Sequence, residues 1–526
     1  AAHDEPSAAH DEPSAAHDGA SAAHDKPSSA HDKPSSACDE PSASLTLALR
    51  RYCHRVSRSD MEKPTRSKVE AAKPPLPTYF LSLTVSNVRC FGPDQTLDLS
   101  DGQGRPARWT VILGDNGTGK TTLLRLLADM VPKQSDHSAD LVEVSPWVIS
   151  TGPETTRFTR YGKAAATFAA TYCYGNAALK GATPGSLPTA VLSYAVSHYP
   201  DGRPNGSADH TSAPIHNMVV FGYGANRPIG TGSLSEYHTD GTRNLMVEDS
   251  PLLPAEEWFL QQDYIANQKN GGATAARRRL RTAMRLLSAL LPESDFPKDS
   301  EDILSFKAID LSPSRQRIAV HVKTPYGEVQ LRALSLGYRT LIAWTIDLAM
   351  QLFARYPDSK NPLHEPAVVL VDEIDLHLHP KWQRQLFANL SHQFPQVQFV
   401  VTAHSPLIVQ AAGADANIVV VRRPEGQDHV VIDKAPSAVH SWRVDQILTS
   451  DLYGLPSARS PELDEKYARR RVLLRKPKLT KKEQAELDEL EAWLVTQPGG
   501  ETPEEMSVWR TLREVAVQLK AKSGRS

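Results

Sequence analysis

The residues best suited to chemistry form a glycine-rich stretch after a short apolar run. Residues 110–113 read Thr-Val-Ile-Leu, and the chain continues with Gly114, Asp115, Asn116, Gly117, Thr118, Gly119, Lys120, Thr121 and Thr122. This spacing satisfies the pattern GxxxxGK[ST], in which glycines let backbone N–H groups curl around phosphate oxygens. The leucines that follow predict an amphipathic helix, whose positive dipole end would face the anion. A chance glycine-rich turn is the alternative, and the combination of strand, lysine, threonine and helix disfavours it.

Two side chains of this stretch carry specific expectations. We expect the ammonium of Lys120 to reach the β and γ phosphates of a nucleotide. We expect the hydroxyl of Thr121 to bind Mg²⁺, because this ion prefers oxygen ligands.

Two adjacent carboxylates follow a second apolar run. Residues 367–371 are all apolar and lead directly into Asp372 and Glu373. An aspartate at the end of a buried strand can hold Mg²⁺ through water, and the adjacent glutamate can orient or deprotonate an attacking water. Alone, the pair could be a cap for the next helix, but its combination with the glycine-rich loop favours the catalytic interpretation.

A histidine follows a third run, the strand predicted over residues 398–402. His404 would then lie at the carboxyl end of a parallel strand, which is the ligand face of such a sheet. There it could hydrogen-bond the γ-phosphate. An ordinary loop histidine would be the preferred interpretation if His404 stood alone.

A second helix start has the composition of an anion site. Residues 334–339 read Leu-Ser-Leu-Gly-Tyr-Arg and open a helix predicted over 340–353. Ser335 and Gly337 at this start would again direct backbone N–H groups toward an anion. Two such starts are more than one nucleotide needs within one chain, and a plain N-cap is the alternative.

The apolar runs also predict the fold class. They occur at 110–113, 218–221, 367–371 and 398–402, with helical stretches between them. Strands that are apolar on both faces are typical of a buried, mostly parallel sheet with helices on both sides. We therefore expect an α/β fold.

These four motifs, in this order, resemble the heads of ABC-type ATPases of transporters, structural-maintenance-of-chromosomes proteins and RecF-like repair proteins. Residues 114–122 are similar to the Walker A form GxNGxGKT, and 368–373 are similar to Walker B with its catalytic glutamate. Residues 334–337 resemble the LSGGQ signature, with Leu336 and Tyr338 at two of its positions, and His404 matches the switch histidine.

A narrower resemblance rests on residues 334–339, 372–380 and 402–406. These stretches are similar to bacterial AAA family ATPases with AAA-15/AAA-21-like domains. That group includes the ATPases of Septu and some retron anti-phage systems, and the OLD-family nucleases.

The resemblance implies a P-loop NTPase of the ABC type that hydrolyses ATP with Mg²⁺. Lys120, Glu373 and His404 would be catalytic, and Thr121 and Asp372 would hold the metal. Residues 114–122 would bind the nucleotide, and Ser335 and Gly337 would close over it from a second head. The heads would form a homodimer or a higher oligomer around ATP, which hydrolysis releases.

The leading function is an ATPase or sensor subunit of a DNA-associated or anti-phage defence system. An effector nuclease subunit and DNA are the candidate partners. A single-chain OLD-type nuclease is the first alternative. It would need a Toprim domain, but the sequence around Glu425 only weakly resembles the start of one, and no DxD pair follows it. A turn between the strands expected at 418–421 and 430–432 explains the Glu425 region better. A transporter subunit is the second, and the long stretch between the motifs argues against it. No clear Q-loop glutamine is present, and residues 221–227, FGYGANR, are the candidate substitute.

Composition divides the chain into parts. The first 42 residues repeat a seven-residue unit six times without a large apolar residue, which predicts disorder. A metal-binding histidine tract is the less favoured interpretation of the repeat. Met61 is the first methionine, and we expect the natural start there. The expected domains are a disordered repeat and linker at 1–78, the ATPase head at 79–460 with an inserted lid subdomain at about 131–330, and a basic C-terminal helical hairpin at 461–526.

Two basic segments raise the question of an anionic partner. A helix predicted over 273–291 has leucines on one face and four arginines on the other. DNA contact is one interpretation, and a solvated face over a buried stripe is slightly favoured. Residues 466–482 hold nine Lys or Arg and no acid, with Pro477 expected to separate two helices and Thr480 to cap the second. The composition of this segment is equally compatible with a surface that binds a phosphate or an acidic partner and with a plain solvated surface.

Composition also excludes several classes. The 526-residue chain has a net charge of −2 and no apolar run of the roughly 18–20 residues that span a bilayer, so no membrane partner is expected. It lacks a secretory signal pattern. Its four cysteines form no CxxC pair, which argues against a disulfide framework and a zinc site. We expect a cytoplasmic location.

Overall fold

In the computed structural model, the described residues all belong to the second of two units along the chain, Pro74–Ser526. The residues that it describes are 76–496 except 136–137, 145–158, 176–186, 199–203, 216–217, 231–233, 235–239, 270–271, 292–302, 313–314, 437, 477–478 and 495. The heptapeptide repeat, its histidines and Met61 lie outside the described residues, so the expectation of disorder there stays a prediction.

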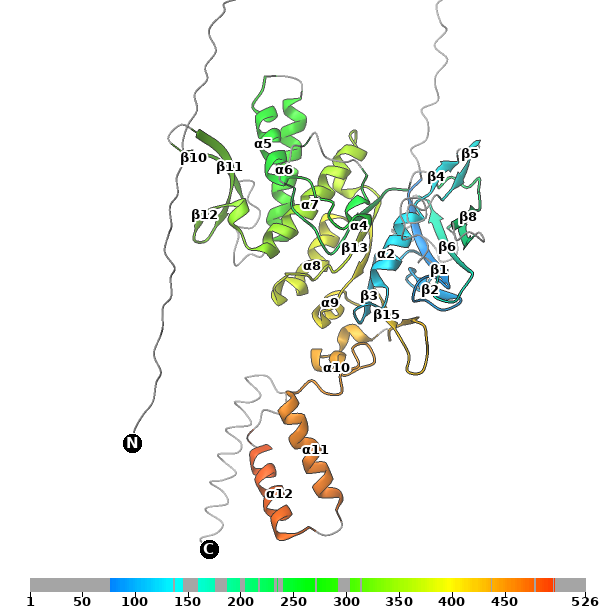
Figure 1. The fold of residues 1–526 in the computed structure, drawn as a ribbon. Coiled ribbons are helices and arrows are strands. Elements are labelled where there is room, and N and C mark those ends of the chain that lie inside the picture. The colour runs from blue at the N-terminus through cyan, green and yellow to red at the C-terminus, as the bar shows by residue number, and fades with distance from the viewer. Residues whose placement is uncertain are drawn as a thin grey trace, which may run out of the picture. The chain divides into compact units, whose positions relative to one another are not determined.

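A six-stranded sheet lies at the centre of the second unit (Figure 1). Its order is β16-β15-β3-β14-β13-β9, and every neighbouring pair is parallel except β15 with β16. The strands are β3 (Trp109–Gly114), β9 (Val220–Tyr223), β13 (Ala367–Val371), β14 (Val397–Thr402), β15 (Asn417–Arg422) and β16 (Val431–Lys434). The predicted α/β fold with a mostly parallel sheet is confirmed, although β9 begins two residues later than predicted.

The central strands are apolar throughout because both faces of the sheet are buried. In β13, Val369 and Val371 pack into one hydrophobic core, whereas Val368 and Leu370 pack into another. The first core is covered by helices (Figure 1). They are α5 (Ala255–Ala266), α6 (Ala273–Leu290), α7 (Leu336–Arg355) and α8 (Pro380–Gln393).

The second core lies under α2 (Lys120–Asp129), α4 (Arg243–Met246) and a second sheet. This sheet is antiparallel, in the order β2-β1-β6-β7-β8. Its strands are β1 (Thr78–Ser86), β2 (Gln95–Asp98), β6 (Ala165–Tyr174), β7 (Thr189–His198) and β8 (Pro204–Ala208). One face of the parallel sheet is therefore covered largely by strands, whereas the sequence predicts helices on both faces.

The sequence predicts an inserted lid subdomain over about 131–330, and the described part of this range is arranged differently. It supplies β6, β7 and β8 to the antiparallel sheet, β9 to the parallel sheet, and α5 and α6 to the helical cover. The apolar face of α6, with Leu280, Met284 and Leu287, is buried in the first core. Burial of that face ties α6 to the core. The remaining strands are β4 (Lys133–Ser135), β5 (Ser138–Glu143), β10 (Leu304–Ser312), β11 (Arg315–Thr324) and β12 (Gly327–Gln330).

Four more helices follow β14 along the chain, and β15 and β16 lie between the first two of them. The helices are α9 (Pro406–Ala411), α10 (Val444–Leu448), α11 (Pro461–Arg475) and α12 (Lys481–Leu494). The predicted capping box is confirmed, because the Thr480 N–H donates to Glu483 Oε2 (2.9 Å) and the Glu483 N–H donates to Thr480 Oγ1 (3.3 Å). Pro477 and residues 497–526 lie outside the described residues. Among the described residues, no helix is both long and apolar enough to cross a membrane.

Candidate functional site

The glycine-rich loop joins the end of β3 to the start of α2, as the sequence predicts. Gly114, Gly117 and Gly119 have φ values of 150°, 78° and 90°. A Cβ at Gly119 would lie 2.7 Å from Cys90 Sγ, and at Gly114 it would lie 2.2 Å from the Val421 carbonyl oxygen. Glycine is therefore required both by the left-handed backbone and by the close approach of neighbouring chain.

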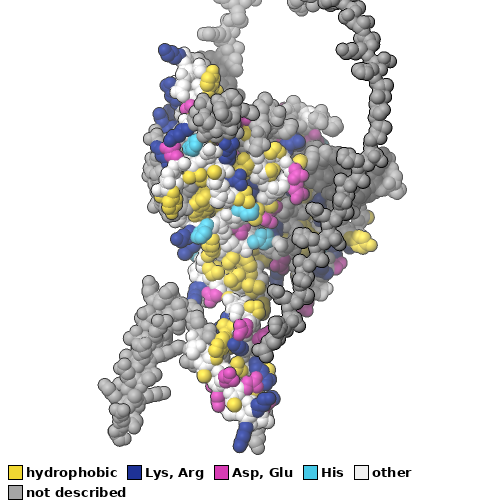
Figure 2. Space-filling model, turned by 60° about the vertical axis from the view of Figure 1, so that its left-hand side comes forward, with side chains coloured by type: hydrophobic (Ala, Val, Ile, Leu, Met, Phe, Trp, Pro, Cys, Tyr) yellow, Lys and Arg dark blue, Asp and Glu magenta, His cyan; other side chains and the backbone are white. Residues whose placement is uncertain are grey.

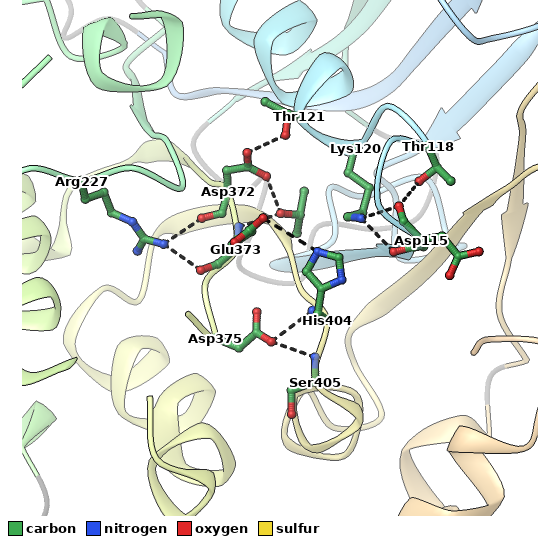
Figure 3. A network of polar contacts seen from close by, with 12 residues as sticks. Asp115, Thr118, Lys120, Thr121, Arg227, Asp372, Glu373, Asp375, His404 and Ser405 are labelled. Carbon is green, nitrogen blue, oxygen red and sulfur yellow. Dashed lines mark hydrogen bonds and ion pairs between the residues drawn. The ribbon is translucent and has the colours of Figure 1, made fainter. Parts of the chain in front are cut away.

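Lys120 is held inside this loop (Figure 3). Its ammonium Nζ donates to the carbonyl oxygens of Gly114 (2.8 Å) and Asp115 (2.9 Å), and the residue is 7% exposed. Burial lowers the pKa of Lys120, and the nearby carboxylates of Asp372 and Glu373 oppose that shift. The loop thus concentrates a desolvated positive charge where a phosphate would enter.

Thr121 and Asp372 meet at the other side of the loop. The Thr121 hydroxyl donates to Asp372 Oδ2 at 2.6 Å, and the Thr402 hydroxyl donates to Asp372 Oδ1 at 2.6 Å. Asp372 is 4% exposed. A hydroxyl and a carboxylate oxygen at hydrogen-bonding distance form a donor set of the kind that Mg²⁺ prefers, so these residues fit the expected metal.

Glu373 follows directly and has an unusual backbone. Its φ is 48°, and its N–H donates to Thr402 Oγ1 at 2.7 Å. The carboxylate Oε1 lies 3.9 Å from His404 Nε2, and both side chains are about one third exposed. Glu373 and His404 therefore face each other at the mouth of the site (Figure 3).

An aspartate that the sequence analysis did not select fixes the histidine loop. Asp375 Oδ2 accepts hydrogen bonds from the backbone N–H of His404 (3.1 Å) and of Ser405 (2.8 Å). The Ser405 hydroxyl in turn donates to Gln383 at 2.6 Å. The loop after β14 is thereby tied to the segment after β13, which keeps His404 beside Glu373.

A cavity of about 390 Å³ brings most of the predicted residues together. Its lining residues are Arg89, Cys90, Asn116, Gly117, Gly119, Lys120, Thr121, Thr122, Asp372, Glu373 and His404. Arg89 and Cys90 come from the segment after β1 and were not predicted. Burial raises the pKa of the Cys90 thiol.

Ser335 and Gly337 do not line this cavity. Ser335 is the N-cap of α7, which begins at Leu336 and not at residue 340 as predicted, and the Ser335 side chain makes no capping hydrogen bond. Ser335 is exposed, and the Leu336 side chain is 48% exposed. Gly337 is buried, and a Cβ there would lie 2.3 Å from the His377 carbonyl oxygen. This helix start belongs to a different surface of the chain.

Arg227 is the last residue of the segment proposed to replace the missing glutamine. Its guanidinium Nη2 donates to the carbonyl oxygens of Asp372 (2.9 Å) and Glu373 (2.7 Å), and the residue is 6% exposed. Burial lowers the pKa of Arg227 to about 10, so the group remains charged at neutral pH. The segment after β9 therefore contacts the two acidic residues through their backbone (Figure 3).

Comparison with known families agrees with this geometry. Residues 242–410, which include β13, β14 and the start of α7, match the model of an "AAA domain, putative AbiEii toxin, Type IV TA system". Residues 82–131, which include the glycine-rich loop, match a second AAA domain model. Two stretches of the chain are thus similar to AAA domains.

Curated proteins that are similar to this chain include a Septu protein and two retron proteins. The chain is 24% identical over 405 residues to the Septu protein PtuA of Bacillus mycoides, covering 75% of this chain and 47% of that protein. It is 46% identical over 82 residues to the Retron Vc95 probable ATPase of Vibrio cholerae (16% of each chain). It is 28% identical over 230 residues to the Retron Ec83 probable ATPase of Escherichia coli (36% and 42%). The chain spans less than half of the length of each of these relatives.

Solved structures give a weaker likeness to the AAA domain. An SMC head bound to the C-winged helix domain of ScpA matches with a TM-score of 0.39 at 18% identity, covering 68% of this chain and 97% of that one. The recombination mediator protein RecF matches with a TM-score of 0.35 at 11% identity, covering 69% and 99%. At these TM-scores the solved structures add nothing to the fold class that the sheet topology establishes.

Proposed function

We propose that this chain binds ATP and hydrolyses its terminal phosphoanhydride bond. One observation carries the proposal: a single cavity is lined by Lys120, Thr121, Asp372, Glu373 and His404. These residues come from three segments of chain that follow β3, β13 and β14 at one edge of one sheet. Together they supply a phosphate loop, two oxygens suited to a metal, a candidate base and a histidine. The relatives named as probable ATPases support the same activity.

We propose a part in the reaction for each of these groups. The backbone N–H groups of the loop and Lys120 would hold the β and γ phosphates. Thr121 and Asp372 would hold Mg²⁺, which neutralises charge on the phosphate oxygens. Glu373 would orient a water and accept its proton as the water oxygen bonds to the γ-phosphorus and ADP leaves. His404, 3.9 Å from Glu373, would hydrogen-bond the γ-phosphate from the adjacent loop.

Steady-state phosphate release by the full chain with Mg-ATP tests this proposal. Glu373→Gln keeps the size of the side chain but removes the base, so kcat should fall by about 100-fold or more while ATP still binds. A wild-type chain without turnover, or a Glu373→Gln variant with full turnover, would overturn the assignment.

The second helix start supports a dimeric arrangement. Ser335 is exposed, its hydroxyl makes no capping hydrogen bond, and it lies outside the nucleotide cavity. We propose that two heads sandwich ATP, so that Ser335 and the backbone at Gly337 of one chain close the loop of the other. The ATP-bound form would then be a homodimer or part of a higher oligomer.

The names of the relatives support a defence role. Septu and retron proteins are among them, so we propose that the chain is the ATPase subunit of an anti-phage system with an effector nuclease subunit as partner. A single-chain nuclease is less well supported. Glu425 lies in the predicted turn between the antiparallel strands β15 and β16, not in a separate domain.

A basic surface on α6 supports DNA as a further partner. Arg278, Arg281, Arg285, Lys360 and His364 line a hollow of about 300 Å³. α6 itself carries five arginines and no acid over 18 residues, with its opposite face buried. We propose that this α6 surface contacts the phosphate backbone of duplex DNA.

The C-terminal hairpin is basic in sequence but is neutralised in part. Arg469 pairs with Glu486 (2.7 Å), Arg470 with Glu491 (2.8 Å), and Lys476 with Glu483. These pairs join α11 to α12. Acidic and basic side chains are therefore interspersed on the hairpin (Figure 2).

Charge reversal separates the two basic surfaces. The double variant Arg278→Glu and Arg281→Glu should weaken binding of a fluorescent DNA duplex by about tenfold or more at low salt. The matched control is Arg471→Glu with Lys482→Glu, which reverses two exposed charges on the hairpin. Equal losses of DNA affinity in the two variants would mean that only the net charge of the chain matters. An unchanged DNA affinity in the α6 variant would show that the α6 surface does not bind DNA.

A further inference from the structure

Arg227 is a buried charge whose contacts go to backbone rather than to a carboxylate. Its Nη2 bridges the carbonyl oxygens of Asp372 and Glu373, and its Nε is buried without a partner among the described residues. Taking a guanidinium out of water is costly, and an apolar side chain of similar volume is often no less stabilising. Fold stability alone is therefore a poor reason for an arginine at this position.

The backbone that Arg227 contacts has a conformation that needs support. Glu373 has a φ of 48°, in the left-handed region that non-glycine residues rarely adopt. On its amino side, the N–H is held by the Thr402 hydroxyl at 2.7 Å. On its carboxyl side, the carbonyl is held by Arg227 at 2.7 Å. The two contacts fix the peptide planes on both sides of Glu373 and so fix the direction in which its carboxylate leaves the chain.

We infer that Arg227 is a positioning residue for Glu373. The guanidinium clamps the Asp372–Glu373 backbone so that the carboxylate faces the cavity, and it also links β9 to the end of β13. Arg227 is not among the residues that line the cavity, so it acts through Glu373 and not on the nucleotide. The inference rests on the proposed ATP hydrolysis.

Arg227→Lys tests the clamp with the charge kept. An ammonium on a shorter, non-planar group cannot reproduce the bridge to two carbonyls. We expect kcat to fall by about 10- to 100-fold, because small misplacement of a catalytic group is expensive, while the affinity for a fluorescent ATP analogue changes by less than about threefold. A matched control is Arg108→Lys, since Arg108 Nη2 also bridges two carbonyls, those of Ser391 and Phe394, and Arg108 lies outside the cavity.

A double variant separates positioning from a general loss of structure. If Arg227 acts through Glu373, then Arg227→Lys added to Glu373→Gln should lower single-turnover hydrolysis by less than about twofold further, because the two changes remove one function. Additive losses, or equal kcat losses in Arg227→Lys and Arg108→Lys, would overturn the inference. So would an unchanged kcat in Arg227→Lys. Failure of the wild-type chain to hydrolyse ATP would instead reject the proposed function on which the inference rests.

Discussion

The two helix starts that resemble anion sites in sequence differ sharply in structure. At α2, three glycines with positive φ, a lysine held inside the loop and the carboxylate of Asp372 form a cavity within one chain. At α7, Ser335 is exposed, its hydroxyl caps nothing, and the neighbouring Leu336 presents an apolar side chain to solvent. The first start has a lysine and a carboxylate beside it in one cavity, whereas the start of α7 lies against a separate hollow whose lining includes Arg332, Arg339 and His377.

The difference shows what a helix N-terminus needs in order to act as a binding site. Backbone N–H groups and the helix dipole are common to both starts. What distinguishes α2 is the surrounding set of charged and hydroxyl groups from β13 and β14. We therefore interpret α2 as the site that determines affinity within one chain, and α7 as a surface that contributes only when a second chain supplies the nucleotide.

Removing the lysine should have the largest effect. Lys120→Ala deletes the charge that the loop holds next to the phosphates, and we expect the affinity for a fluorescent ATP analogue to fall by about 100-fold, since bonds to charged groups are worth about 1.5–3 kcal/mol. Equilibrium titration measures this, with Lys133→Ala on the exposed strand β4 as the control. An undiminished affinity in Lys120→Ala would show that the loop before α2 is not the nucleotide site.

Blocking the second helix start should have a smaller and different effect. Ser335→Arg adds bulk to an exposed position, so binding of the analogue by dilute monomer should change by less than about twofold. Turnover at high protein concentration should fall by about tenfold, because the dimer that supports it cannot close. The dependence of ATPase rate on protein concentration measures this, and a loss of binding in the monomer would place Ser335 in the same site as Lys120.

The sequence predicts the parts of the site that follow a strand directly. Residues 114–122, Asp372 and His404 each come after an apolar run, and a parallel sheet brings the carboxyl ends of such runs to one edge. The local pattern is therefore sufficient to place them. Thr402 could also have been found, because it is a polar residue that ends an apolar strand.

The remaining parts depend on tertiary contacts that no local pattern reveals. Arg89 and Cys90 reach the cavity from the segment after β1, which belongs to the other sheet. Uninterrupted apolar runs do not mark β6 and β7, because their large apolar residues are interrupted by small or polar ones. The start of α7 was placed four residues too late, since Gly337 has a weak helix propensity.

The mass of Glu373→Gln with and without Mg-ATP tests the central claim most directly, because this variant should bind ATP but hydrolyse it slowly. Light scattering should show a monomer without nucleotide and a dimer with Mg-ATP, and adding Ser335→Arg should return the mass to that of the monomer. A Glu373→Gln chain that binds the ATP analogue but keeps one mass under both conditions would contradict the proposed division between α2 and α7.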